Sequence, residues 1–293
     1  MSVAPPAVHT LPQSAPAFRG RIGRDARSGH YAVPRRYRLH LSRACPDGLR
    51  IAVTHSLLGL GDICPVACLP AVPDSPDGGY SALRPLYEAS AHRYAGPAGA
   101  PVLSDDWSGR IVSTHAPDIT RDLARRFGGD RAALYPRDAE SEIEAVERMC
   151  AQGIEEAAQH AGSAGAGQRE DRAAALGRLL ETLGALERWL AGRTYLIRDH
   201  VTAADVVLWG TLVQLDTVHR EHLDASAVHR IAGHPALWDY ARRLTAHPAF
   251  GAHLDLDGIT RRHHAHCRGL EAAGAAVRIL DWTAHAARPA TGT

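Results

Sequence analysis

The sequence predicts a small α/β domain followed by a domain made only of helices. In the first half, short apolar runs with a period of two alternate with helical patterns. From Leu134 onward the strand-like runs disappear, and apolar residues recur at three- and four-residue spacing. With 293 residues, 45% of them hydrophobic, the chain is long enough to bury two cores.

The α/β part begins with a strand and a helix. Residues 37–44 alternate, so that Tyr37, Leu39 and Leu41 fall on one face of a strand. Residues 48–61 have helical apolar spacing, and glycines at the end of this run terminate the predicted helix.

Three more strands and a second helix complete this domain. The strands are predicted over 62–72, 100–105 and 109–114, and the helix over 116–127. The order is β-α-β, then a hairpin, then α. This is the thioredoxin-like arrangement.

Four helical patterns follow. They cover 138–161, 168–192, 203–218 and 234–250. The third is apolar nearly all round, which predicts a central buried helix, with Thr202 and Asp205 as a capping box at its start. The fourth is expected to stop at Pro248.

The chain therefore divides into four predicted parts. They are an N-terminal arm (1–34), a thioredoxin-like domain (35–129), an all-helical domain (134–262) and a C-terminal tail (263–293). The opening stretch is rich in Pro and Ala and lacks the pattern of a signal peptide. A small α/β domain followed by an all-helical domain is the two-part plan of the glutathione transferases (GST fold).

The composition excludes several classes of partner. A net charge of +1, from 33 basic and 32 acidic residues, gives no steering toward nucleic acid, and no apolar run is long enough to cross a membrane. Five cysteines without a signal peptide favour a reducing cytoplasm. All the basic residues are arginine, a composition typical of a GC-rich genome.

Cys45 stands where the first strand meets the first helix. A cysteine at a helix start faces unpaired backbone N–H groups and the positive end of the helix dipole. Both favour the thiolate and predict a lowered pKa, which makes Cys45 the candidate nucleophile; a packed structural cysteine is the alternative. Pro46 suits the first helical position.

Around these residues the chain resembles the glutathionyl-hydroquinone reductases, the Xi class of glutathione transferases, which are related to the Omega class. The resemblance covers approximately residues 18–264 and includes "RYRLHLSRACP", "APVLSDDWSGRIVS" and "YLIRDHVTAADVVLWGTLVQLDTV". It implies that Cys45 attacks the sulfur of a thiol conjugate and that a second thiol resolves the mixed disulfide. It also implies a cis bond before Pro101, backbone contacts to the thiol near Val102, and a thiol-binding role for Arg50.

The chain departs from the family's pattern at the expected site. Where the family has Trp-Ala-His after Cys-Pro, this chain has Asp47-Gly48-Leu49, and where the family has Glu-Ser after the fourth strand, it has His115-Ala116. In place of pocket tyrosines it has Glu155, His219 and the pair His263-His264.

These departures predict a different thiol, a different acceptor, or both. Losing two hydrogen bonds to the charged γ-glutamyl end, at about 1.5–3 kcal/mol each, weakens glutathione binding by orders of magnitude. The GC-rich coding style fits an actinobacterium, for which mycothiol is the usual thiol and ergothioneine is another candidate. Asp47 is a thiol contact or a proton shuttle in one interpretation and a helix-capping surface carboxylate in the other.

Two other groups of residues have side chains capable of metal or thiol chemistry. His263, His264, His266 and Cys267 crowd together too closely for a tetrahedral zinc site without outside help, so no metal is predicted. Cys64 and Cys68 are expected on one face of a strand as core thiols, and Cys150 is expected in the core of the helical domain.

The sequence thus predicts an enzyme, a cysteine-dependent thiol transferase or S-conjugate reductase acting on a small molecule, and a homodimer as is usual for the resemblance. Asp47, Arg50, Pro101, Val102 and His115 are expected to bind the thiol, with the residues that replace the tyrosines lining the substrate pocket. One alternative is a non-covalent C–S bond-forming or C–S lyase enzyme of natural-product metabolism. The other is a non-catalytic ligand-binding protein.

Overall fold

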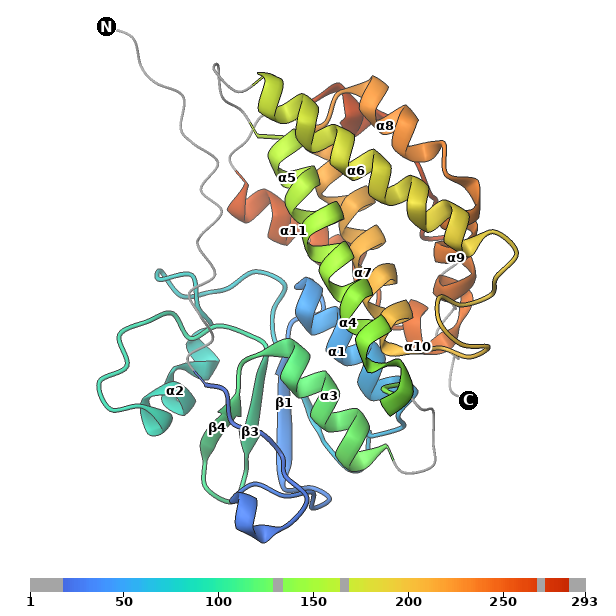
Figure 1. Cartoon of the computed structure of the whole chain (residues 1–293). Coiled ribbons are helices and arrows are strands. Elements are labelled where there is room, and N and C mark those ends of the chain that lie inside the picture. The colour runs from blue at the N-terminus through green and yellow to red at the C-terminus, as the bar shows by residue number, and fades with distance from the viewer. Residues whose placement is uncertain (1–17, 129–133, 164–168, 268–271, 285–293) are drawn as a thin grey trace, which may run out of the picture. The chain divides into compact units, whose positions relative to one another are not determined.

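The structure, a computed structural model, describes residues 18–128, 134–163, 169–267 and 272–284 (Figure 1). Most of the predicted arm, residues 1–17, lies outside this range. The chain divides into two compact units, one reaching to Glu140 and including His253–Arg262, the other containing Ser141–Ala252 and the residues from His263 on. Among the helices within the described ranges, none is both long enough and apolar enough to span a membrane.

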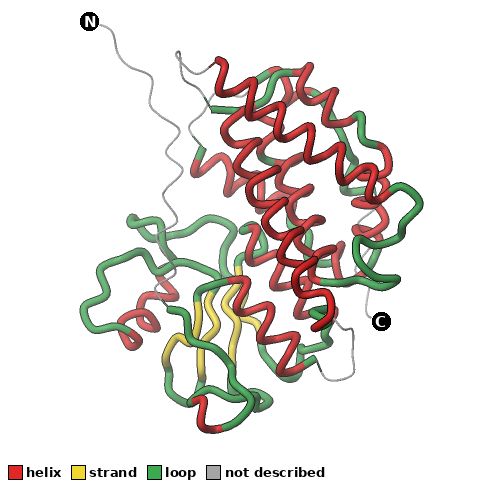
Figure 2. The backbone as a smooth tube through the Cα atoms, viewed as in Figure 1, coloured by secondary structure: helices red, strands yellow, loops and turns green. Residues whose placement is uncertain are grey.

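The first unit is built on one four-stranded sheet, drawn in yellow in Figure 2. The strand order is β2-β1-β3-β4, with bounds Val66–Cys68, Tyr37–Leu41, Val102–Asp105 and Arg110–Ser113. β1 pairs parallel with β2 and antiparallel with β3, and β3 pairs antiparallel with β4. This mixed topology confirms the predicted thioredoxin-like domain.

Three α-helices flank the sheet: α1 (Pro46–Leu57), α2 (Arg84–Ser90) and α3 (Ala116–Phe127). Figure 1 shows α2 on one side of the sheet, and α1 and α3 packed together on the other. Short 3-10 turns lie at Ala26–Ser28, Ser81–Leu83 and Arg137–Ala139. The sequence did not predict α2, because seven residues are too few for a periodic pattern. The helix forms because Tyr87 is buried with Leu83, Val102 and Ile111.

The second unit is helical, which confirms the all-helical C-terminal part of the GST fold. The elements from Glu140 on, in order, are α4 (Glu140–Arg148), the π-helix η4 (Met149–Glu156), α5 (Ala157–Ala161), α6 (Arg169–Leu190), α7 (Ala203–Thr217), the 3-10 turn η5 (His219–His222), α8 (Ala225–Ala232), α9 (Pro235–Ala246), α10 (Pro248–Gly251), α11 (Leu256–His266) and the 3-10 turn η6 (Ala273–Ala276). The boundary between the two units falls within α11, after Arg262, so this helix contributes residues to both.

Three details of these helices differ from the sequence prediction, and the first is that α8 is not among the predicted helices. Pro248 does stop α9, but it also occupies the first turn of the next helix, α10, where a proline's missing N–H is not needed. The segment 263–266, expected within a polar tail, is the last turn of α11. Few apolar residues mark this helix, so its pattern resembles that of a loop.

The long helical pattern over 138–161 contains a π-helical segment, η4. Its backbone lies close to α6, since a Cβ at Gly153 would come within 2.5 Å of the Thr182 hydroxyl oxygen. π-helical turns frequently occur at functional positions. This one carries Glu155. The Glu155 carboxylate accepts a hydrogen bond from Thr211 on α7, so this side of the helix faces α7.

The cysteines all lie in the described part of the chain and form no disulfide. Cys64 and Cys150 are buried, as predicted, but the interpretation of Cys68 as a core thiol is wrong. β2 begins only at Val66, so Cys64 lies outside the strand. Cys68 is the last residue of the strand, and its side chain is exposed.

The predicted central helix α7 is buried along almost its whole length. Asp205 is fully buried, and its carboxylate reaches back to accept hydrogen bonds from the backbone N–H of Thr202 at 2.7 Å and from that residue's hydroxyl at 2.8 Å. It also accepts from the Leu196 N–H and the Tyr240 hydroxyl. One carboxylate therefore joins the start of α7, the preceding loop and α9.

Asp205→Ala is expected to lower the free energy of unfolding by about 2–4 kcal/mol, because it removes a helix cap and leaves buried donors without an acceptor. Chemical denaturation followed by circular dichroism measures the change. Asp239→Ala on α9 is the control, since that side chain is 56% exposed and pairs at the surface with Arg242. Equal effects of the two substitutions would contradict the role given to Asp205.

Candidate active site

Cys45 lies at the junction of β1 and α1, as the N-cap residue rather than within the first turn. Its backbone is extended, with φ −90° and ψ 135°, and its carbonyl accepts the hydrogen bond of Leu49 N–H at 2.9 Å. Pro46 follows at the predicted first helical position. The Cys45 side chain makes no capping hydrogen bond, but the backbone amides of Asp47 and Gly48 lower the pKa of its thiol. The local geometry thus presents the thiol to the positive end of α1.

Gly48 is required by a close approach of two backbone segments. A Cβ at this position would lie 2.1 Å from the Ser42 carbonyl oxygen, closer than any stable contact. The same carbonyl accepts the Cys45 N–H at 3.1 Å. The loop after β1 is therefore folded tightly against the first turn of α1, which explains the glycine in "CPDG" and fixes the backbone of Cys45.

The expected lowering of the Cys45 pKa is wrong. Although the residue keeps some exposed surface, packing around the sulfur desolvates it, and this burial together with the negative charge of Asp47 raises the pKa above its ordinary value. The charge of Arg262 and the amides of Gly48 and Asp47 act in the opposite direction without outweighing the other two effects. The resting group is a thiol at neutral pH.

Arg262 is a residue near Cys45 that the sequence did not predict. It lies on α11, and its guanidinium donates to the Ala71 carbonyl at 3.1 Å and to the Tyr80 hydroxyl at 3.0 Å. Its positive charge lowers the pKa of Cys45. The signal was present in "RRHHAHC", but no local spacing relates that stretch to a cysteine more than two hundred residues earlier.

Asp47 and Arg50 lie one turn apart on α1. The Arg50 guanidinium is 3.7 Å from the Asp47 carboxylate, a loose ion pair on a partly exposed face. Asp47 occupies the first turn, where its charge is favourable to the helix dipole. Both interpretations of Asp47, as capping carboxylate and as site residue, are compatible with this position.

The sheet brings the other predicted thiol-binding residues to the same edge as Cys45. The peptide bond before Pro101 is cis, as the resemblance implied. Val102 is the first residue of β3 and pairs with His40, near the C-terminal end of β1. The loop to Cys45 begins at that end. β4 ends beside this same part of β3, since Ser113 pairs with Leu103. His115 follows two residues later.

His115 is the N-cap residue of α3 and lies in a network of charges. Its Nδ1 is 3.0 Å from the carboxylate of Asp118, which also pairs with Arg19 and Arg21. Burial raises the pKa of Asp118, but the hydrogen bond from Arg19 and the neighbouring positive charges bring it below its ordinary value. His115 therefore meets a carboxylate that is ionised at neutral pH.

In the helical unit, Glu155 and His219 are electrostatic neighbours. Glu155 accepts a hydrogen bond from the Thr211 hydroxyl at 2.8 Å. Its charge raises the pKa of His219, but burial is the larger effect, and with the repulsion of His222 the pKa falls to about 4. His219 is therefore neutral at physiological pH.

His263 belongs to a second group of imidazoles. Its Nε2 lies 3.1 Å from Nε2 of His222, and its ring centre is 6.0 Å from that of the exposed His264. Burial, and then the neighbouring histidines, lower its pKa to about 4. His222 was not among the predicted site residues, because nothing in "HREHL" distinguishes it from a surface histidine.

The predicted site residues thus form two sets. Cys45, Asp47, Arg50, Pro101, Val102 and His115 belong to the thioredoxin-like unit, and Glu155, His219, His263 and His264 belong to the helical unit. Within the first set the sheet topology gathers the helix starts and the cis peptide at one edge. Within the second set, the side chains interact through Glu155 with His219 and through His222 with His263.

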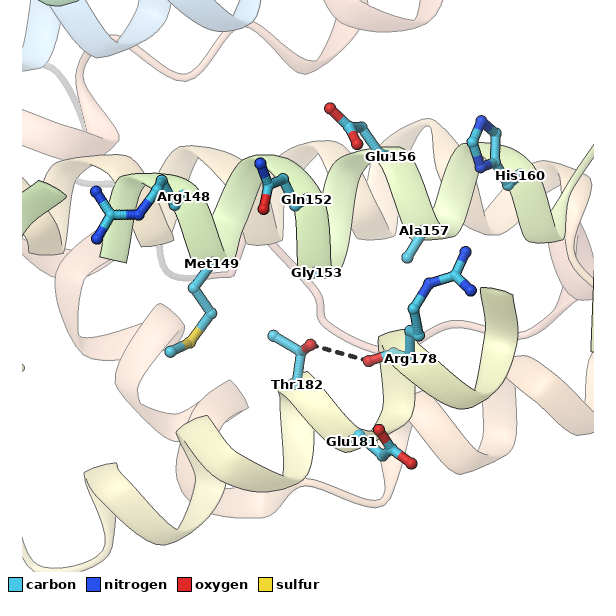
Figure 3. A pocket seen from close by; sticks show the side chains of 10 residues that line it. All are labelled: Arg148, Met149, Gln152, Gly153, Glu156, Ala157, His160, Arg178, Glu181 and Thr182. Carbon is cyan, nitrogen blue, oxygen red and sulfur yellow. Dashed lines mark hydrogen bonds between the residues drawn. The ribbon is translucent and has the colours of Figure 1, made fainter. Parts of the chain in front are cut away.

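A groove of about 490 Å³ lies between the helix that carries η4 and α6 (Figure 3). Arg148, Glu156, Arg178 and Glu181 are among its lining residues. None of the predicted site residues lines it, and Glu156 is on its wall while the adjacent Glu155 bonds to α7. The groove is separate from the candidate site.

Comparisons with known proteins agree with this architecture. The family described as "Glutathione S-transferase, C-terminal domain" matches residues 144–243. Glutathionyl-hydroquinone reductase PcpF of Sphingobium chlorophenolicum is 30% identical over 255 residues, which cover 80% of this chain and 79% of that protein.

Two solved structures are similar along most of the chain. One is the glutathione-bound structure of YqjG, a glutathione transferase homologue from Escherichia coli K-12 (TM-score 0.72, 26% identity, covering 84% of this chain and 87% of that one). The other is glutathione S-transferase Xi from Phanerochaete chrysosporium (TM-score 0.72, 25% identity, covering 86% of this chain and 92% of that one). The thioredoxin-like sheet, the buried helix α7 and these similarities together show that the chain belongs to the family of glutathionyl-hydroquinone reductases, the Xi-class glutathione transferases.

Proposed function

We propose that this protein is a cysteine-dependent thiol transferase or reductase that acts on small-molecule thiol conjugates. The observation that carries the proposal is the position of Cys45, which faces the amides at the start of α1 at the sheet edge that also holds the cis peptide before Pro101. Membership of a family of transferases and reductases supports it.

In the proposed reaction, the Cys45 thiolate attacks the sulfur of a conjugate in which a thiol is joined to a quinone-type carbon. The new S–S bond forms as the C–S bond breaks, and the carbon takes the electron pair and then a proton. A second molecule of thiol attacks the mixed disulfide, releasing a symmetrical disulfide and the Cys45 thiolate. The organic product is reduced and two thiols are oxidised, so the electrons balance.

The raised pKa of Cys45 sets a requirement on this mechanism. Because the resting thiol is protonated, a proton must leave before or during the attack. Asp47 and Arg262 are the charged residues that act on the sulfur. We propose that Asp47 shuttles this proton and that Arg262 stabilises the resulting thiolate.

The identity of the thiol is a finer part of the proposal. The relatives above are named for glutathione, but His115 and Ala116 stand at the start of α3, and His115 is held by Asp118. The carboxylate and hydroxyl with which the family holds the γ-glutamyl group are thus replaced by an imidazole and a methyl group. We therefore propose that the protein binds glutathione weakly and uses another small thiol, such as mycothiol or ergothioneine. Glu155, His219, His263 and His264 are proposed to line the acceptor pocket.

Cys45→Ser is expected to lower turnover of a glutathionyl- or mycothiyl-hydroquinone by about a thousandfold or more, because the covalent step is lost. Intact-mass spectrometry of the wild type during turnover is expected to detect a thiol adduct, located on Cys45 by peptide mapping. Cys68→Ser is the matched control, since Cys68 is an exposed thiol that is not among the predicted site residues. Full turnover by Cys45→Ser would favour a non-covalent C–S enzyme, and binding without turnover would favour a ligand-binding protein.

Two substitutions are expected to shift the pKa of Cys45 in opposite directions. Asp47→Asn removes a charge that raises this pKa and is expected to lower it, whereas Arg262→Gln removes a charge that lowers it and is expected to raise it. The pH dependence of iodoacetamide alkylation, followed on the Cys45 peptide, measures both. Alkylation of Cys68 in the same samples is the internal control. Shifts of the same sign would refute the proposed electrostatics.

The thiol proposal is tested by thermal shift with glutathione, mycothiol and ergothioneine. Wild type is expected to be stabilised by one of the latter two and not by micromolar glutathione. The double variant His115→Glu/Ala116→Ser is expected to gain stabilisation by glutathione, because it restores an acidic partner and a hydroxyl. Stabilisation of the wild type by micromolar glutathione would show that this part of the proposal is wrong.

A further inference from the structure

Three potential metal-binding atoms converge in the helical unit. His222 is the last residue of η5, His263 lies in the last turn of α11, and Cys267 follows that helix. Nε2 of His222 is 3.1 Å from Nε2 of His263 and 3.4 Å from Sγ of Cys267. All three atoms lie within 4.8 Å of one another, and all three residues are partly buried.

These distances are close to those of a tetrahedral zinc site. With Zn–N bonds of about 2.0–2.1 Å and a Zn–S bond of about 2.3 Å, neighbouring ligand atoms are separated by roughly 3.3–3.6 Å. The observed separations at His222 differ from this range by only a few tenths of an ångström. The third separation, between Nε2 of His263 and Sγ of Cys267, is at most 4.8 Å.

Hydrogen bonding alone satisfies this group poorly. Nε2 of His263 lies 3.2 Å from the Glu221 carboxylate as well as 3.1 Å from His222. A neutral imidazole carries at most one hydrogen on this nitrogen, so His263 donates to only one of these two neighbours. A cation placed among the nitrogens and the sulfur interacts favourably with every lone pair at once.

We propose that His222, His263 and Cys267 bind one Zn²⁺ ion, with a fourth position for water or the Glu221 carboxylate. Two imidazoles and a thiolate are a donor set suited to zinc, and three protein ligands leave one coordination position open. The ion would join the end of α11 to η5. The proposal does not depend on the reaction at Cys45.

The sequence predicted no metal, because the ligands within "RRHHAHC" alone crowd too closely for tetrahedral geometry. His264 and His266 are exposed and take no part in the cluster. The missing ligand comes from 41 residues before His263, and only folding brings it into place.

Zinc binding is tested on the full chain, purified with a chelator and dialysed, by competition of added Zn²⁺ against a chromophoric zinc chelator. One ion per chain is expected for the wild type, with at least about tenfold weaker affinity for Cys267→Ser and for His222→Asn. Cys68→Ser and Cys45→Ser are the matched thiol controls and are expected to bind as the wild type does.

Co²⁺ in place of Zn²⁺ identifies the ligands independently of affinity. The wild type and Cys45→Ser are expected to give the thiolate-to-cobalt charge-transfer band and the visible bands of tetrahedral cobalt, and Cys267→Ser is expected to lack the charge-transfer band. Circular dichroism of each variant in chelator checks folding. No zinc binding by the wild type, or loss of the thiolate band in Cys45→Ser in place of Cys267→Ser, would overturn the proposal.

Discussion

The close packing of the loop after β1 against the first turn of α1 is the contact on which the candidate active site depends. The Ser42 carbonyl accepts the Cys45 N–H, and it also lies where a Cβ at position 48 would be. With glycine at that position, the helix begins close to the end of the strand, and the cysteine becomes its N-cap. The sheet register then sets the cis peptide before Pro101 and the start of α3 at the same edge.

Position at a helix start does not by itself decide the ionisation of a thiol. At Cys45 the amides favour the thiolate, but desolvation and the nearby carboxylate of Asp47 have the larger combined effect. The helix dipole acts over the first turn and is worth at most about 2 kcal/mol. A buried sulfur with an acidic neighbour thus stays protonated until a ligand or a proton acceptor changes its surroundings.

In the helical unit, two kinds of polar cluster lie within one apolar framework. Asp205 is saturated with donors from three segments and holds α7 in place. The imidazoles of His219 in η5 and His263 in α11, in contrast, are neutral at physiological pH because burial lowers their pKa. A saturated carboxylate serves the fold, whereas the converging ligand atoms of His222, His263 and Cys267 are suited to binding.

The sequence by itself determined the two-part fold, the approximate positions of the strands and of the longer helices, the buried character of α7 and the capping role of Asp205. Period-two and helical spacing are local properties, so they could be predicted, as could the cis peptide through the family resemblance. Only the tertiary structure decided the rest: the short helix α2, the exposure of Cys68, the raised pKa of Cys45, and the meeting of His222 with Cys267. Each of these depends on which distant segments pack together, since desolvation and the distance between side chains are set by that packing and not by neighbours in the chain.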